Sequence, residues 1–224
     1  WSGELLRTDG RWKYGVPPVS NANYAWIQHF LYHLSPKGTA GFVMAKGSLS
    51  SKTNGEGEIR KNIIEAGLVD CIVNLPTKLF LNTQIPACLW FLSREKETDP
   101  NHPRRNKILF IDARNMGTLI NRRTRELTDE DIRKIADTYH NWKKDDGSYK
   151  DIPGFCKCAT LDEVRELDYV LTPGRYVGLP EEEDDFDFEE RVKKLTAELK
   201  EQMEESVKLD ERIKENLKKV GIEL

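Results

Sequence analysis

The stretch GEIRKNIIEAGLVDCIVNLP, residues 57–76, decides the fold. Residues 58–66 are predicted to form a helix, because the isoleucines recur at spacings that place them on one helical face. Gly67 follows and favours the end of this helix, since glycine readily adopts the left-handed conformation of a C-cap. Residues 68–75 are mostly apolar and are bounded by Pro76, a pattern typical of a strand buried on both faces of a sheet. The stretch therefore predicts a helix that leads directly into a central strand.

Three further apolar runs extend this pattern on both sides, at residues 39–45 (TAGFVMA), 85–93 and 107–111. The run Thr39–Ala45 also predicts a strand buried on both faces. A helix is predicted before it, at residues 21–34, where apolar positions recur at steps of three and four. Strands that alternate with helices at these spacings indicate an α/β sheet with crossover helices.

The pattern changes after residue 112. Helices are predicted at residues 128–142 and 160–167, the second with Thr160 and Glu163 as a capping-box pair. The predicted organisation is an α/β domain at 1–112, a mixed helical and extended segment at 113–180, and an acidic linker with a long helix at 181–224.

The last predicted helix, residues 186–219, is amphipathic. Its apolar positions form a stripe close to the 3.6-residue helical period, and the stripe consists of Val192, Leu195, Leu199, Met203, Val207, Ile213 and Leu217. Such a stripe packs against something. Packing within the chain and packing on the helices of another subunit both remain open at this point.

Composition bounds the class of protein. The chain has 224 residues, a net charge of −3, 33% charged residues and four cysteines. Its apolar runs are far shorter than the roughly 20 residues of a membrane span, and its cysteines are too few for a disulfide framework. These observations exclude a membrane-spanning, collagen-like or fully disordered chain and favour a reducing, cytoplasmic compartment.

The charge is unevenly placed. Residues 181–224 hold 16 acidic and 9 basic residues, whereas residues 1–180 hold 22 acidic and 26 basic ones. The body is therefore mildly basic and the tail acidic. A mildly basic body is compatible with contact to phosphates, but an ordinary solvated surface explains the charge equally well.

No self-contained catalytic, cofactor-binding or metal-binding set is predicted. The chain has no Walker loop, no G-x-S-x-G elbow and no H-E-x-x-H motif. His29 and His33 lack further ligands at metal-binding spacing, and Cys156 with Cys158 lacks a second ligand pair. The glycine-rich Gly55-Glu56-Gly57 precedes a helix, but its acidic neighbours disfavour bound phosphate.

Several long runs nevertheless resemble one family. They are RWKYGVPPVSNANYAWIQHFLYHLSPKGTAGFVMAKGSLSS, GEGEIRKNIIEAGLVDCIVNLPTKLF and TQIPACLWFLSRE, followed in the same order by KILFIDARN and YVLTPGRYVG. They resemble the second half of the DNA methylase domain in the modification subunit of type I restriction–modification systems. The resemblance covers about residues 1–180.

The resemblance implies a function. Such subunits have a doubly wound, Rossmann-like methyltransferase sheet that binds S-adenosylmethionine at the carboxyl ends of its first strands. They methylate adenine N6 in DNA after flipping the base out of the duplex. A specificity subunit supplies sequence recognition, and a restriction subunit completes the system. The C-terminal helices of the family pack on the specificity subunit, which is the interpretation that the resemblance gives to the apolar stripe.

The sequence departs from the family where the chemistry resides. It has no glycine-rich cofactor motif and no Asn/Asp-Pro-Pro-Phe/Tyr motif, because Val16-Pro17-Pro18-Val19 lacks both the amide or carboxylate and the aromatic. Since the first residue is Trp1, we expect a C-terminal fragment of such a methylase, inactive alone and without bound cofactor. The alternative is a stand-alone, non-catalytic module that binds protein or DNA.

The resemblance also suggests a path for DNA. Residues 39–45, 69–75 and 85–92 match the family's fifth, sixth and antiparallel seventh strands, and Phe80 matches an aromatic that packs on the flipped base. Phe80 as an ordinary core residue is the alternative. The other candidates for lining the DNA path are Lys46, Ser48, Lys78, Asn82, Thr83 and Gln84.

Overall fold

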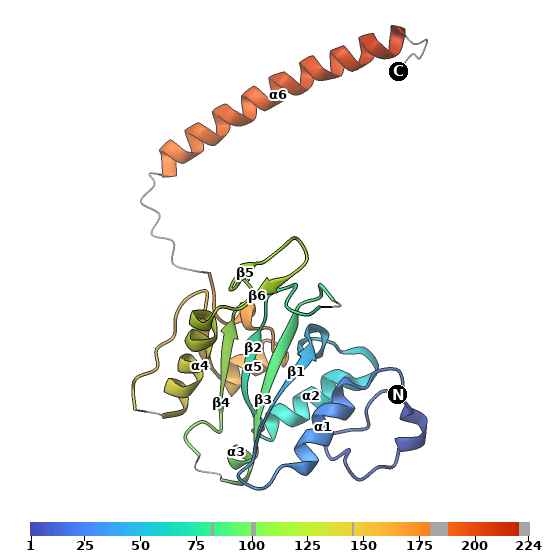
Figure 1. Cartoon of the computed structure of the whole chain (residues 1–224), viewed down its shortest axis with the longest axis vertical. Helices are drawn as coiled ribbons and strands as arrows, with labels where there is room; N and C mark the ends of the chain where they lie inside the picture. Colours follow the sequence, from blue (N-terminus) through green and yellow to red (C-terminus); the bar gives the residue numbers. More distant parts are fainter. Residues whose placement is uncertain (82, 100–101, 145, 180–187, 220–224) are drawn as a thin grey trace. The chain divides into compact units, whose positions relative to one another are not determined.

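The computed structural model describes residues 1–81, 83–99, 102–144, 146–179 and 188–219 (Figure 1). The chain divides into two compact units, Trp1–Glu181 and Glu182–Leu224. The first unit contains the sheet, and the second contains the long helix α6, Phe188–Lys219. The acidic run at 181–185 lies outside the described residues.

Five strands form one mixed sheet in the order β1-β3-β2-β4-β7. Their bounds are β1 Thr39–Ala45, β2 Val69–Asn74, β3 Ala87–Ser93, β4 Lys107–Asp112 and β7 Cys156–Thr160. β2 and β4 are parallel, while β3 runs antiparallel to both β1 and β2, and β7 antiparallel to β4. β3 therefore lies between β1 and β2, which agrees with the predicted antiparallel strand. The predicted α/β fold class is confirmed.

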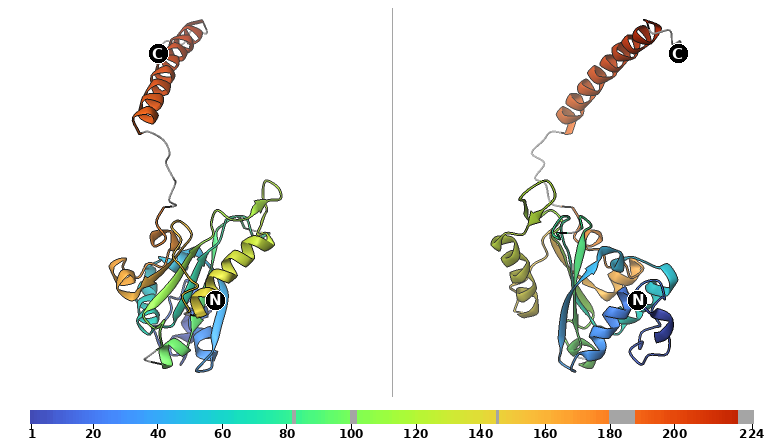
Figure 2. Two further views of the ribbon diagram at one scale, coloured as in Figure 1. Left: turned by 90° about the vertical axis from the view of Figure 1, so that its left-hand side faces the viewer. Right: turned by 45° about the vertical axis from the view of Figure 1, so that its right-hand side comes forward.

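Helices cover both faces of the sheet (Figure 2). α1, α2 and α5 lie on one face, where they share a core with Ile72 and Trp90, and α4 lies on the other, where Trp142 joins the second core cluster. The helices are α1 Asn23–His33, α2 Glu56–Glu65, α3 Glu95–Thr98, α4 Asp129–Lys144 and α5 Leu161–Glu166, with 3₁₀ turns at Gly3–Leu6, Lys46–Leu49, Thr53–Gly55 and Pro173–Arg175.

The central strand β2 is buried on both faces, which accounts for its continuous apolar sequence. Every residue from Val69 to Asn74 is buried. Because successive strand side chains point to opposite faces, Ile72 joins the core under α1 and α2, while Cys71 and Val73 join the core under α4. A strand packed on both faces has no position for an exposed polar side chain.

β1 corrects one prediction. Thr39–Ala45 was predicted to be buried on both faces, but its residues alternate between exposed and covered, and Val43 is 51% exposed. The reason is position, since β1 pairs only with β3 and forms an edge of the sheet among the described residues. The apolar composition of β1 resembles that of a central strand, but the burial of its side chains depends on which strands and helices lie beside it.

The segment 113–180 contributes to the same sheet. β7 was not predicted, because its sequence CKCAT is short and has little apolar pattern. The predicted capping box of α5 is confirmed, with Thr160 Oγ1 accepting from Glu163 N at 3.3 Å and Glu163 Oε2 accepting from Thr160 N at 2.8 Å. The later segment also packs inward, where Tyr176 stacks on Phe110 at 3.8 Å between ring centroids.

A buried polar network fixes α3 and α4 to the sheet. The Asp70 carboxylate accepts a 2.8 Å hydrogen bond from the Tyr139 hydroxyl of α4 and faces Lys96 Nζ at 3.5 Å, and both Asp70 and Lys96 are fully buried. Lys96 Nζ also donates to the carbonyls of Val69 (2.6 Å) and Lys107 (2.8 Å). Burial lowers the pKa of Lys96 to about 8.

Removing one partner of this network is expected to be costly. Asp70→Ala should lower the free energy of unfolding by about 3–5 kcal/mol, because it leaves the Lys96 ammonium buried without a counter-charge. Asp162→Ala is the control, since Asp162 forms an exposed pair with Arg165 and should change stability by less than about 1 kcal/mol. Urea unfolding measures both, and equal losses in the two variants would contradict the structural role of Asp70.

Candidate DNA-facing edge

Three strands that run in the same direction end at one edge of the sheet. β1 ends at Ala45, β2 at Asn74 and β4 at Asp112. Ligand sites in open α/β sheets lie outside the carboxyl ends of the strands. Figure 1 shows the β5–β6 hairpin at this edge, beyond the point where β4 ends. The candidate site is therefore built from the loops that leave these strand ends, and we call it the carboxyl edge.

The loop between β2 and β3 contains most of the candidate DNA residues. Phe80 and Thr83 form an isolated β-bridge, and Thr83 Oγ1 accepts from Ile85 N at 3.1 Å. The loop exposes apolar side chains, since Phe80 is 38% and Leu81 is 92% exposed. Phe80 is thus neither a core residue nor fully free. It lies partly covered on a loop at the carboxyl edge.

The structure places most of the predicted DNA-path residues at the carboxyl edge, with the exception of Ser48. Thr83 and Gln84 are exposed on the same loop as Phe80. Lys46 directly follows Ala45, whose partner in β3 is Ala87, so Lys46 lies beside the end of this loop. Lys78 is partly exposed near the start of the loop. Asn82 lies outside the described residues.

Ser48 is a correction. It was a candidate for the DNA path, but it is fully buried. Its hydroxyl donates to the Ala45 carbonyl at 2.7 Å and accepts from the Trp90 indole at 3.1 Å. The neighbouring Cys88 is also fully buried, which raises its thiol pKa to about 11. Ser48 therefore holds the turn after β1 against the core and does not reach the surface.

Sequence reasoning missed a polar cluster where β2 and β4 end. Asn74 Nδ2 donates to Asp112 Oδ1 at 3.1 Å, and Asp112 Oδ2 pairs with Arg114 Nη2 at 2.8 Å. A Cβ on Gly174 would lie 2.7 Å from Arg114 Nη2, so the backbone of the segment 169–178 approaches the cluster closely. The sequence feature that could have predicted this cluster is the polar residue at the end of each of two buried strands, Asn74 in β2 and Asp112 in β4.

A second missed element is the hairpin of β5, Thr118–Leu119, and β6, Arg125–Glu126. Gly117 starts it with a φ of +80°, and a Cβ there would lie 2.6 Å from the Glu126 carbonyl, so glycine is required. Arg125 Nη1 donates to the carbonyls of Met116 (2.8 Å) and Gly117 (2.9 Å). These contacts preorganise the hairpin.

Lys78 ties this hairpin to the loop that contains Phe80. Its ammonium donates to the Arg122 carbonyl at 2.9 Å, and its own carbonyl accepts from Arg125 N at 2.9 Å. Lys78 has a φ of +67°, a left-handed conformation in which both of these bonds form. The predicted role of Lys78 was DNA contact, and the structure also gives it a role in joining the two loops.

The described residues do not fit S-adenosylmethionine or a metal. The turns that leave β1, β2 and β4 begin KGSL, LPTK and ARNM, and none is a glycine-rich turn into an α-helix of the kind that holds such a cofactor. Within the described ranges, no group of three His, Cys, Asp or Glu side chains is placed to hold a metal ion. We therefore derive no chemical step through either group from these residues.

Residues 1–185 match the family described as N-6 DNA Methylase. The chain belongs to this family. The resemblance found in the sequence is thereby confirmed. In the part of the chain that the structure describes, no helix of this family member is long and apolar enough to cross a membrane.

Curated relatives of this N-6 DNA methylase chain name a more specific group. The type I restriction enzyme HindI methylase subunit of Haemophilus influenzae is 54% identical over 224 residues, which are 100% of this chain and 49% of the relative. The MjaIX methylase subunit of Methanocaldococcus jannaschii is 45% identical over 229 residues, 99% of this chain and 40% of the relative. The chain thus spans about half the length of these relatives or less.

Solved structures agree on the fold. The type I restriction–modification methyltransferase subunit of Streptococcus thermophilus superposes with a TM-score of 0.68 at 31% identity, over 80% of this chain and 35% of that one. The EcoKI M protein superposes with a TM-score of 0.56 over 82% of this chain and 43% of that one, and at 17% identity it supports the fold alone.

Local exchange should reveal how the hairpin is held. Arg125→Gln is expected to raise the hydrogen-exchange rate of the Ile120 amide at least about tenfold, because hydrogen bonds from a charged donor contribute about 1.5–3 kcal/mol. Arg123→Gln is the control, because its exposed side chain makes no hydrogen bond to the other described residues. Exchange that is equally fast in both variants would show that the Arg125 guanidinium does not hold the hairpin.

Proposed function

We propose that this chain is the part of a type I DNA adenine-N6 methyltransferase subunit that receives the target base and the adjoining DNA. The observation that carries the proposal is the partly exposed Phe80 on the loop between β2 and β3, with Lys78 on the same loop and Lys46 at the end of β1, all at the carboxyl edge. Family membership supports the reaction class, and the geometry supports the assignment of this edge.

The proposed roles follow from ordinary chemistry. An adenine that leaves the duplex loses its stacking partners, and an aromatic side chain replaces part of that interaction, worth about 1–3 kcal/mol per base. Phe80 is 38% exposed and its backbone is held by the bridge to Thr83, so part of its ring is available for contact. Lys46 and Lys78 carry the positive charge that phosphates next to an extruded base require.

We further propose that the chain does not transfer methyl groups alone. S-adenosylmethionine, which supplies the methyl group, and the Asn/Asp-Pro-Pro-Phe/Tyr motif, which holds the adenine amino group, would come from other parts of a complete methylase. In this proposal the complete protein works in the cytoplasm with a specificity subunit and a restriction subunit. A stand-alone, non-catalytic binding module is the alternative.

A chimera separates these two possibilities. The matching segment of the HindI methylase subunit is replaced by this chain, to which it is 54% identical, and the chimera is combined with the specificity subunit of that system. We expect labelled S-adenosylmethionine to methylate adenine N6 in DNA that contains the cognate site, while the 224-residue chain alone transfers no label. A folded, assembled chimera without activity would favour the stand-alone module.

Within this chimera, Phe80→Ala should lower kcat/KM for DNA about 5- to 150-fold, which corresponds to the loss of 1–3 kcal/mol of stacking. Phe80→Trp should retain most of the activity, because it keeps a ring face. Leu81→Ala is the matched control on the same loop, where the side chain is 92% exposed. If Phe80→Ala lowered the unfolding free energy but left kcat/KM unchanged, Phe80 would be a packing residue only.

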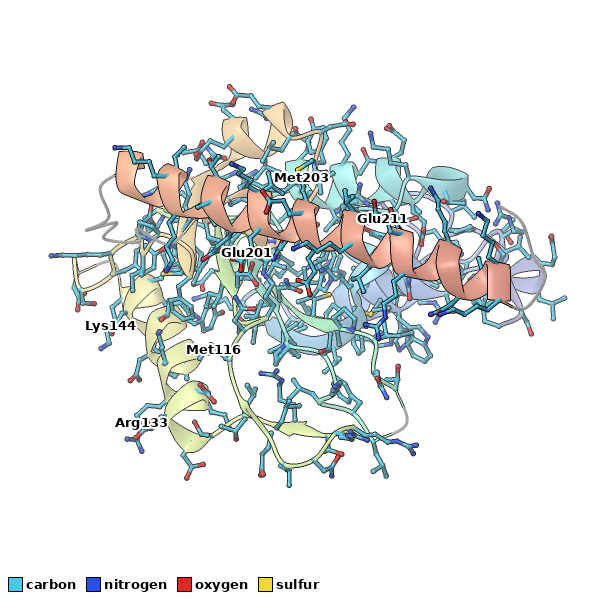
Figure 3. All side chains as sticks on the ribbon, turned by 90° about the horizontal axis from the view of Figure 1, so that it is seen from above. Met116, Arg133, Lys144, Glu201, Met203 and Glu211 are labelled. Carbon is cyan, nitrogen blue, oxygen red and sulfur yellow. The ribbon has the colours of Figure 1, made fainter. Side chains whose placement is uncertain are left out.

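We propose that α6 docks on the specificity subunit. The predicted stripe lies on one side of this helix, and six of its seven residues are exposed, namely Val192, Leu195, Leu199, Met203, Val207 and Ile213, with Leu217 partly exposed. Met203 and Glu201 are labelled on α6 in Figure 3. An apolar stripe of this length on a polar helix is typical of a surface that packs on partner helices.

Point substitutions test this docking. Leu199→Glu with Met203→Glu should abolish co-purification of the complete methylase subunit with its specificity subunit, as should removal of residues 186–224. Lys194→Glu with Lys208→Glu is the control, because these positions lie on the opposite side of the helix. The control substitutions also make the helix more negative than the Leu199 and Met203 substitutions do. Unchanged assembly after removal of 186–224 would refute the docking role.

A further inference from the structure

The β5–β6 hairpin is built at the carboxyl edge without any core of its own. Each of its strands has two residues, and a ribbon this short is not stable in isolation. Its position comes from polar bonds, those of Arg125 to Met116 and Gly117 and those of Lys78 to Arg122 and Arg125. Its turn is fixed by the Asn121 side chain, which accepts from Arg123 N (2.8 Å) and Thr124 N (2.9 Å).

The hairpin exposes apolar and cationic side chains side by side in sequence. Leu119 is 53% and Ile120 is 60% exposed. Next to them, Arg122 and Arg123 are exposed, and their side chains make no hydrogen bond or ion pair with any other described residue. Figure 3 shows side chains projecting outward from the hairpin that follows Met116. Apolar and cationic side chains are thus held together in solvent, which favours a partner that is both anionic and partly apolar.

The charge of residues 117–125, which include most of the hairpin, favours the same anionic partner. Residues 117–125 contain three arginines and no acidic residue. The nearest acidic residues in sequence are Asp112 before this segment, and Glu126 and residues 129–131 after it, where the Asp131 carboxylate accepts from Thr128 N and Oγ1 as a cap. The acidic residues therefore flank residues 117–125, and none lies within them.

We propose that the β5–β6 hairpin is a DNA-contacting element beside the extruded adenine, with Arg122 and Arg123 on phosphates and Leu119 and Ile120 against the opened base step. This inference rests on the proposed function, because the hairpin is bonded through Lys78 to the loop that contains Phe80. Phosphate contacts from arginine supply affinity that depends on salt. Apolar side chains placed at an unstacked base step compensate for the lost stacking.

The test measures binding of the whole 224-residue chain to a short fluorescein-labelled DNA duplex by anisotropy, over salt concentrations from about 50 to 200 mM. Arg122→Gln with Arg123→Gln should weaken binding about tenfold at the lowest salt concentration and little at the highest, because the slope of log K against log salt becomes shallower by about 2. The matched control is Lys37→Gln with Lys107→Gln, which removes the same charge at the opposite edge of the sheet and should leave the slope unchanged.

The apolar residues have a different expected signature. Leu119→Ser with Ile120→Ser should weaken binding without changing the salt slope, since no phosphate contact is lost. The hairpin proposal is overturned if the wild-type chain does not bind DNA, if the arginine variant keeps the wild-type affinity and slope, or if the control pair changes the slope as much. It is also overturned if hairpin variants keep DNA affinity but lose assembly with the specificity subunit, because the hairpin would then contact protein.

The chimera distinguishes a failure of the hairpin proposal from a failure of the proposed function. If the unsubstituted chimera methylates DNA and the arginine variant does so with unchanged KM for DNA, only the hairpin proposal is wrong. If the unsubstituted chimera is folded and assembled but inactive, the proposed function is wrong, and the anisotropy result still decides whether the hairpin contacts DNA.

Discussion

The antiparallel pairing of β3 between β1 and β2 is the constraint on which the rest of the structure depends. A chain that leaves β2 at the carboxyl edge and returns through an adjacent antiparallel strand must keep its connecting loop at that edge. The loop containing Phe80 is therefore placed next to Lys46, which directly follows β1. A parallel crossover would instead have taken the chain back to the opposite edge through a helix.

That constraint holds only because both faces of the sheet are covered. β2 is buried along its whole length, and its alternate residues enter two separate cores, one under α1, α2 and α5 and the other under α4. The buried network of Asp70, Lys96 and Tyr139 joins α3 and α4 to the start of this strand. The scaffold is rigid at its centre, while the groups available for contact lie on loops at one end, as is usual for functional sites.

The loops at the carboxyl edge are coupled to each other by hydrogen bonds to backbone carbonyls. Lys78 holds the hairpin through one side-chain bond and one main-chain bond, and Arg125 closes the base of the hairpin. Such bonds fix the position of the backbone, so the same edge can present an aromatic ring, apolar residues and arginines that form no ion pair with the other described residues. The proposed contact with DNA would use this combination, since nucleic acid offers both phosphates and base faces.

The sequence by itself determined the α/β class, the antiparallel strand, the capped helix α5 and the apolar stripe of α6, because these follow from periodicity, capping chemistry and a family resemblance in long runs. Only the tertiary structure decided the burial of Ser48, the exposure of β1, the pairing of β7 and the joining of Lys78 to the hairpin. Each of these depends on contacts between residues far apart in the chain, such as Ser48 with Trp90 and Lys78 with Arg122. Local sequence patterns indicate which helix or strand a segment can form, whereas the burial and the hydrogen-bond partners of its side chains depend on which segments lie beside it.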